Sequence, residues 1–289
     1  MQGNPWWSVE LSARVATGSG ASSQRVHRIY LAGLRRYGDC APLHHACAVH
    51  LWRSGDRRRA RKHFNVALGK EPEHSGYLTN YANFLVEGEG SSRSRAGRLY
   101  QRAFARSAED ETVLCNYGSY LIHCGGRKGL SRAIELYAAA IKKGKEGRLT
   151  RLNWRAARLC ARSSGWRADL DDVIARLELG FWPRQPDNLL FEAAFLACCF
   201  LSRGDPRRRL VLAALGAAVD AERGRAESGA SPAWTRPGDM SLSTYTRHSR
   251  ATRTERAWLG RLEQVLRGAR PPSILSRWKS WRASVLTHA

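Results

Sequence analysis

The chain has 289 residues, with 48 Lys and Arg against 25 Asp and Glu, and so carries a formal net charge of +23. This length allows a substantial core, and this charge excludes cationic partners in favour of nucleic acid, anionic lipid or an acidic protein surface. Six of the seven Cys lie in apolar helical patterns, so no disulfide framework is expected, and no apolar run reaches the roughly 20 residues that cross a bilayer. We therefore expect an intracellular protein in a reducing compartment.

The N-terminal segment, residues 1–23, contains Trp6, Trp7, Gly18, Gly20 and several Ser, and we expect it to be irregular. From Ser8 to Arg36, five Arg and many Ser and Ala accompany one acid, which suits a mitochondrial or plastid transit segment. Two localisations follow: a cytoplasmic protein with a frayed N-terminus, or an organellar protein with a targeting segment.

A repeat occupies residues 24–144. The segment Tyr77–Leu85 is echoed 36 residues later by Val113–Leu121, and a second set of segments also match one another: Arg59–Ala67, Arg95–Ala103 and Arg132–Ala140. A fixed period of this length, with small and aromatic residues at fixed offsets, predicts stacked helical hairpins. The pattern gives a lone second-helix half-repeat near Val26, followed by three full repeats over 41–74, 75–110 and 111–144.

Small residues recur where the two helices of a repeat must approach closely. The predicted close pairs are Ala48/Ala60, Ala82/Ala96 and Gly118/Ala133, and the aromatic residues predicted to be buried between repeats are Phe64, Tyr100 and Tyr137. This combination resembles the tetratricopeptide repeat (TPR) family over roughly residues 26–144. The resemblance implies an all-α fold, a TPR-like right-handed superhelix of antiparallel helix hairpins, and it says little about the partner.

The pattern weakens in the second half of the chain. We expect divergent helical hairpins over residues 145–225. The composition of residues 226–253, which is rich in Ser, Thr, Arg and Pro, predicts a flexible linker. Residues 254–289 predict two short helices that cap the stack. The last is basic and amphipathic through Ile274, Trp278, Trp281 and Val285, so docking to a partner or an anionic membrane is the alternative role.

Most catalytic signatures are absent from the sequence, so we expect no enzymatic activity and no cofactor. The nearest approach to a metal site is the set Cys40, His44, Cys47 and His50, which would share one face if a single helix began at Cys40. Pro42 places Cys40 before the helix, and Cys47 occupies a core position. Core and surface roles are therefore expected for these residues, and no metal site.

A peptide-binding groove is the favoured interpretation of the repeats, because the first helix of each hairpin lines the concave face of such a stack. The expected concave-face residues are Trp52, Arg53, Thr79, Asn80, Asn83, Asn116 and Ser119, with Arg151 and Arg155 within reach. The alternative is an unoccupied, solvated face whose Asn residues belong to the repeat pattern. We expect a non-catalytic scaffold for protein–protein interaction. If its positive charge binds RNA, the scaffold would act within a ribonucleoprotein assembly.

Some TPR proteins hold the C-terminal carboxylate of a chaperone tail with a clamp of Lys, Asn, Asn, Lys and Arg. The resemblance places this clamp at Thr79, Asn83, Asn116, Arg151 and Arg155. Thr79 stands where the family has its first Lys, so the site lacks one charge-assisted donor.

The basic run Arg57, Arg58, Arg61 and Lys62 brackets Ala60 and is expected on the outer surface of a second helix. Direct binding of an RNA backbone through these residues is the alternative function, and a solvated basic face is the plainer interpretation. An enzyme with its site in the divergent C-terminal half is the remaining alternative.

Overall fold

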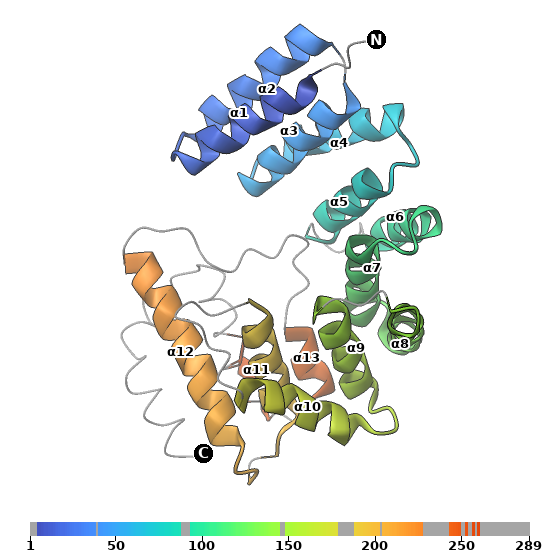
Figure 1. The fold of residues 1–289 in the computed structure, drawn as a ribbon, viewed down its shortest axis with the longest axis vertical. Coiled ribbons are helices and arrows are strands. Elements are labelled where there is room, and N and C mark those ends of the chain that lie inside the picture. Colours follow the sequence, from blue (N-terminus) through green and yellow to red (C-terminus); the bar gives the residue numbers. More distant parts are fainter. Residues whose placement is uncertain are drawn as a thin grey trace. The chain divides into compact units, whose positions relative to one another are not determined.

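The computed structural model describes residues 5–38, 40–87, 93–144, 148–178, 188–202, 204–227 and 243–249, with short pieces between 252 and 260. All regular structure in these residues is helical, as predicted, and the fold is all-α (Figure 1). The helices are α1 (Trp6–Gly18), α2 (Ser23–Tyr37), α3 (Ala41–Arg53), α4 (Arg57–Lys70), α5 (Ser75–Val86), α6 (Arg93–Arg106), α7 (Glu111–Cys124), α8 (Gly126–Lys142), α9 (Arg148–Ala161), α10 (Trp166–Glu178), α11 (Asn188–Phe200), α12 (Arg208–Glu227) and α13 (Ser243–His248).

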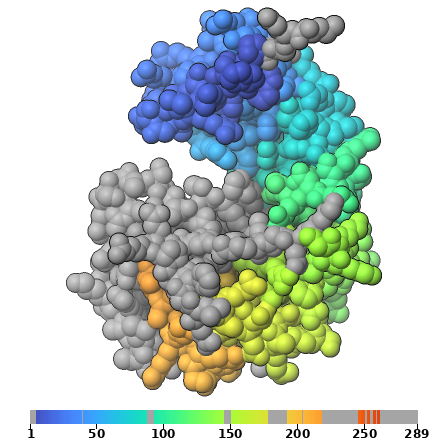
Figure 2. Space-filling view, in the orientation of Figure 1, coloured from blue at the N-terminus to red at the C-terminus, as the bar shows by residue number. Residues whose placement is uncertain are grey.

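The chain divides into two compact units, Met1–Tyr117 (unit 1) and Gly118–Ala289 (unit 2), with α7 spanning the boundary. In unit 1, α1 packs on α2, α3 on α4, and α5 on α6. Figure 2 shows the side chains of unit 1 as a continuous surface that runs from the blue atoms of α1 to the green atoms of α6. In unit 2, α9 packs on α8 and α10, and α11 packs on α10 and α12.

Local signals end and restart these helices where the sequence predicts turns. Gly55 adopts a φ of 87° between α3 and α4, a conformation that favours glycine. Asp56 then caps α4, because its carboxylate accepts a hydrogen bond from the backbone N–H of Arg59 at 3.0 Å. His74 caps α5 in the same way through its Nδ1 atom and the N–H of Tyr77.

The predicted core residues are buried. Phe64, Tyr100 and Tyr137 are fully enclosed, and so are the predicted small residues Ala48, Ala60, Ala82, Ala96 and Ala133. Phe64 stacks against Tyr81 with ring centroids 5.4 Å apart, so aromatic packing joins the pair α3–α4 to α5. The prediction that these small and aromatic residues are buried in the core is confirmed.

The prediction of an irregular N-terminal segment is wrong, because residues 6–18 form α1. Val9 and Ala13 are buried, and Gly33 of α2 leaves room for the Val9 side chain, since a Cβ at Gly33 would lie 2.5 Å from it. α2 therefore pairs with α1 and is not a lone half-repeat. Apolar residues lie on both faces of α1, so its sequence shows no helical periodicity of hydrophobic residues.

The predicted linker 226–253 is also partly helical. α12 continues to Glu227, and α13 forms around the buried Tyr245, whose hydroxyl donates to Glu192 at 2.8 Å. One anchoring tyrosine gives no periodic signal, so the sequence did not reveal this helix. The predicted C-terminal helices, including Ile274 and Trp278, lie outside the described residues except for short helical pieces near residues 256–260.

Within the described part of the chain, no helix has both the length and the apolar character needed to cross a membrane. The Cys residues are all free thiols. Burial raises the pKa of the Cys47 and Cys160 thiols to about 12, which keeps both protonated and inert near neutral pH.

Candidate functional site: a groove in unit 1

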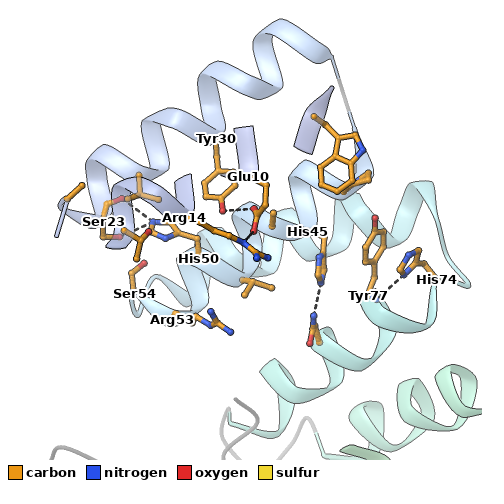
Figure 3. Close-up of a pocket in the computed structure, with 18 of the residues that line it drawn as sticks. Glu10, Arg14, Ser23, Tyr30, His45, His50, Arg53, Ser54, His74 and Tyr77 are labelled. Carbon is orange, nitrogen blue, oxygen red and sulfur yellow. Dashed lines mark hydrogen bonds and ion pairs between the residues drawn. The ribbon is translucent and has the colours of Figure 1, made fainter. Parts of the chain in front are cut away.

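A groove of about 1120 Å³ opens in unit 1 (Figure 3). Its walls come from α1, α2, α3 and the start of α5, so it follows the first helices of three consecutive helix pairs. The polar and aromatic side chains that line it fall into three groups: an ion-paired wall, a stack of rings and a basic end.

The wall of the groove is built around Glu10 of α1. One oxygen of its carboxylate accepts from Arg14 Nε and the other from the Tyr30 hydroxyl, both at 2.8 Å. Tyr30 is buried, and burial with the hydrogen bond to Glu10 raises the pKa of its phenol, which therefore remains a donor. The carboxylate is thus already satisfied, and the side of this wall facing solvent is the Arg14 guanidinium.

The floor of the groove is a stack of three rings. His45 stacks on Tyr77 at 4.5 Å between centroids, and Tyr77 stacks on His74 at 3.8 Å. Burial lowers the pKa of His45 to about 4, so its imidazole is neutral at pH 7. Its Nε2 atom lies 2.9 Å from the Asn80 amide nitrogen, which donates to it. The stack offers a flat, largely apolar surface beside an amide.

The basic end of the groove lies at the last turn of α3. His50 Nε2 is 3.1 Å from the Ser23 carbonyl oxygen and 3.2 Å from its hydroxyl, which ties α3 to the start of α2. Arg53 is exposed, lines the groove and has no ion pair within the described residues. This cation is therefore available to a ligand.

Three predicted concave-face residues of unit 1 are interior instead. Trp52 is 7% exposed, packs edge-on against Phe64 and Phe84, and donates its indole N–H to Glu87. Thr79 and Asn83 are each 2% exposed, and the Asn83 side-chain oxygen accepts from Tyr100. The prediction of these three as accessible ligand contacts is wrong, because the aromatic residues of α4, α5 and α6 close over them.

The other predicted residues divide between the two units. Arg53 and Asn80 line the groove, as expected, whereas the Asn116 amide donates to the Thr112 carbonyl of its own helix at 2.7 Å. In unit 2, Ser119 is buried and accepts from Asn153. Arg151 there is exposed.

The predicted carboxylate clamp is contradicted by burial. Arg155 of unit 2 is 8% exposed and ion-paired with Asp172, and burial lowers its pKa to about 10. Because Thr79, Asn83 and Arg155 are each enclosed within their own unit, the clamp residues do not offer an accessible set of donors.

The His and Cys residues that were considered and not expected as metal ligands make separate contacts. Cys47 Sγ lies 3.5 Å from His27 Nδ1, His44 Nδ1 lies 2.8 Å from His63 Nδ1, and His50 bonds Ser23. Among the described residues, no three His, Cys, Asp or Glu side chains are arranged to hold a metal ion.

The predicted nucleic-acid residues lie on α4. Arg58, Arg61 and Lys62 are exposed. Arg57 is half-buried: its guanidinium donates to the Phe84 carbonyl at 2.7 Å and pairs with Glu87 at 3.5 Å. Arg57 is therefore held by contacts within unit 1.

Reasoning from the sequence did not assign Glu10, Tyr30 or Tyr77 to a site. Glu10 lies in the segment expected to be irregular, and the stacking of His45 on Tyr77 joins residues 32 positions apart, which leaves no local pattern. No protein-family model and no curated protein matches the chain.

Proposed function

We propose that the chain is a non-catalytic, TPR-like right-handed scaffold and that unit 1 binds an extended peptide segment of a partner protein in the groove. The observation that carries this proposal is the groove's course along α1, α3 and α5. Its volume of about 1120 Å³ exceeds the roughly 300–1,000 Å³ of small-molecule pockets, which favours a longer ligand.

The chemistry of the groove suits a polypeptide. An extended backbone needs both donors and acceptors. The groove supplies both, through the side-chain amide oxygen of Asn80, the Tyr77 hydroxyl and the Arg53 guanidinium. Burial raises the pKa of Tyr77 to about 12, so its hydroxyl remains a donor at neutral pH. The ring stack of His45 and Tyr77 gives one apolar side chain a surface to pack on.

Peptide selection on the intact chain tests the proposal. Random peptides displayed on phage are enriched on the wild-type protein, and the dissociation constant of a synthetic winner is then measured by calorimetry. Arg53→Gln with Asn80→Ala should weaken binding by about tenfold or more, because two directional hydrogen bonds to the ligand are lost.

The matched control is Arg28→Gln with Asn116→Ala, which makes the same chemical changes outside the groove lining. Unchanged affinity in this control is the expected result. Failure to enrich any peptide, or equal losses in both double variants, would contradict peptide binding in this groove.

A further inference from the structure

Positive charge is concentrated on two second helices of unit 1. α4 carries Arg57, Arg58, Arg59, Arg61, Lys62 and Lys70, and α6 carries Arg93, Arg95, Arg98, Arg102 and Arg106. Neither helix contains an Asp or a Glu. α5 packs against both helices and has no charged residue. The positive charge therefore lies on the second helices of these pairs.

The acids next to these helices lie in turns and compensate only part of this charge. Asp56 pairs with Arg59 at 2.6 Å, and Glu87 pairs with Arg57. Glu73 is shared by two arginines of α6, at 2.6 and 2.9 Å. The remaining exposed cations without an ion pair in the described residues are Arg58, Arg61, Lys62, Arg95 and Arg98, which we call the α4–α6 basic surface.

One cation from each helix lies over one of two neighbouring aromatic rings of α5. The Arg61 guanidinium lies 5.9 Å from the centre of the Phe84 ring, and the Arg95 guanidinium lies 5.3 Å from that of Tyr81. The Tyr81 and Phe84 rings are themselves 5.9 Å apart. Two adjacent rings thus link an unpaired cation of α4 to one of α6, which places these two charges within reach of one stretch of a polyanion.

We propose that the α4–α6 basic surface binds the sugar–phosphate backbone of a nucleic acid without reading its sequence. Guanidinium groups are well suited to phosphate oxygens, which they can bind with two N–H groups at once. Reading of bases would need exposed aromatic rings for stacking, and Tyr81 and Phe84 are buried beneath the arginines.

A membrane surface fits these residues less well. Interfacial binding combines basic side chains with exposed apolar ones, and the only large apolar side chain exposed on α4 or α6, within the described residues, is Val66 at 37%. The exposed apolar residues Trp7, Leu11 and Val15 lie on α1 instead. The groove also involves neither α6 nor the exposed residues of α4, so this proposal stands independently of peptide binding.

The test compares two variants of the full chain that each lose four positive charges. The first carries Arg58→Gln, Lys62→Gln, Arg95→Gln and Arg98→Gln, and retains Arg61 to keep Phe84 covered. The matched control carries Arg25→Gln, Arg28→Gln, Arg35→Gln and Arg36→Gln, which neutralise exposed residues of α2. Binding of a fluorescein-labelled oligouridine of about 20 nucleotides is followed by anisotropy at several salt concentrations.

For the wild type, about five phosphate contacts predict a slope near −3.5 of log affinity on log salt, or a loss of about 100-fold between roughly 50 and 200 mM salt. The α4–α6 variant should bind far more weakly, with a slope near −0.7, while the α2 control keeps most of the wild-type slope. Equal losses in both variants would attribute binding to net charge alone and overturn the proposal.

Further arms use the wild-type protein and so do not depend on how a variant folds. Bound oligouridine should protect Lys62 from acetylation, read by mass spectrometry, and leave the exposed Lys128 of unit 2 reactive. A matched oligodeoxythymidine should bind comparably. Binding of RNA alone, unprotected Lys62, or binding to vesicles of phosphatidylserine and phosphatidylcholine without binding to RNA would each overturn backbone recognition by this surface.

Discussion

At Gly118 the missing side chain makes room for the Tyr137 ring. A Cβ built at this position would lie 2.2 Å from the Tyr137 hydroxyl oxygen and 2.3 Å from the ring carbon that carries it. Tyr137 is fully buried, so it cannot swing away into solvent. One methyl group therefore decides whether α7 and α8 keep their spacing in unit 2.

We predict that Gly118→Ala destabilises the protein by about 1–3 kcal/mol through overpacking, measured by urea unfolding. The same substitution at Gly69 of α4, where no atom lies within 4 Å of the new Cβ, should instead stabilise by up to about 1 kcal/mol through helix propensity. Equal effects at the two positions would show that the contact with Tyr137 does not constrain the core.

The hydroxyl of Tyr100 is a second residue-scale determinant, because it donates to the Asn83 side chain inside unit 1. Tyr100→Phe leaves that buried oxygen without its donor and should cost about 1–3 kcal/mol in thermal or urea unfolding. Tyr77→Phe is the control, since the Tyr77 hydroxyl has no hydrogen bond within the described residues, and it should be nearly neutral. A neutral Tyr100→Phe would reject the structural role of this pair.

At the scale of the helices, α2, α3 and α4 meet through a group of histidines. His44 and His63 approach within 2.8 Å through their Nδ1 atoms, and the His27 ring meets His63 edge-on at 6.3 Å between centroids. Burial first, then the neighbouring histidines, lower the pKa of His63 to about 4. Burial and the nearby Arg59 lower the pKa of His27, so this interface favours neutral rings.

This arrangement predicts a loss of stability in mild acid. The pKa values of His63 and His45 in the folded protein lie below the roughly 6.5 of an unfolded chain, so the unfolded state binds more protons as the pH falls. The histidines' contribution is fully present above about pH 6.5 and declines between there and about pH 4, by up to about 1.4 kcal/mol per pH unit for each.

Urea midpoints of the intact chain at pH 7.5, 6.0 and 5.0 measure this decline. The variant His63→Asn, which cannot titrate in this range, should show a shallower dependence on pH than the wild type. The control is the same substitution in unit 2, His123→Asn. A wild-type midpoint that does not move over this range would contradict the prediction.

The helix pairs could be predicted from the sequence because each repeat places Ala and an aromatic residue at the same offsets, as at Ala96 and Tyr100. The groove could not be predicted, because two Asn residues of α5 lie in different environments. Asn80 faces the groove, whereas Asn83, three residues later, is enclosed by Tyr100. Only the partner helix decides between them, and the sequence of α5 carries no sign of it. α1 was missed because three of its apolar residues face solvent.

At the scale of the whole molecule, the charge of +23 is distributed unevenly over the helices. The acid-free helices α4 and α6 bring like charges together in unit 1. We predict that sulfate raises the melting temperature of the protein more than chloride does at equal ionic strength, because a divalent anion can bridge two arginines. Replacing Arg58, Lys62, Arg95 and Arg98 by Gln should abolish most of this difference, and an undiminished difference would contradict the assignment to this surface.

If the α4–α6 basic surface binds a polyanion as proposed, the lifetime of the folded chain depends on the supply of that ligand. A polyanion at about 100 times its dissociation constant adds about 2.7 kcal/mol to folding stability by mass action alone. The transiently opened population falls about 100-fold, and with it the rate at which a protease degrades a chain that opens and closes faster than it is cut. Copies made in excess of the polyanion would therefore be degraded first, so the amount of protein would follow the amount of its partner without a dedicated regulator.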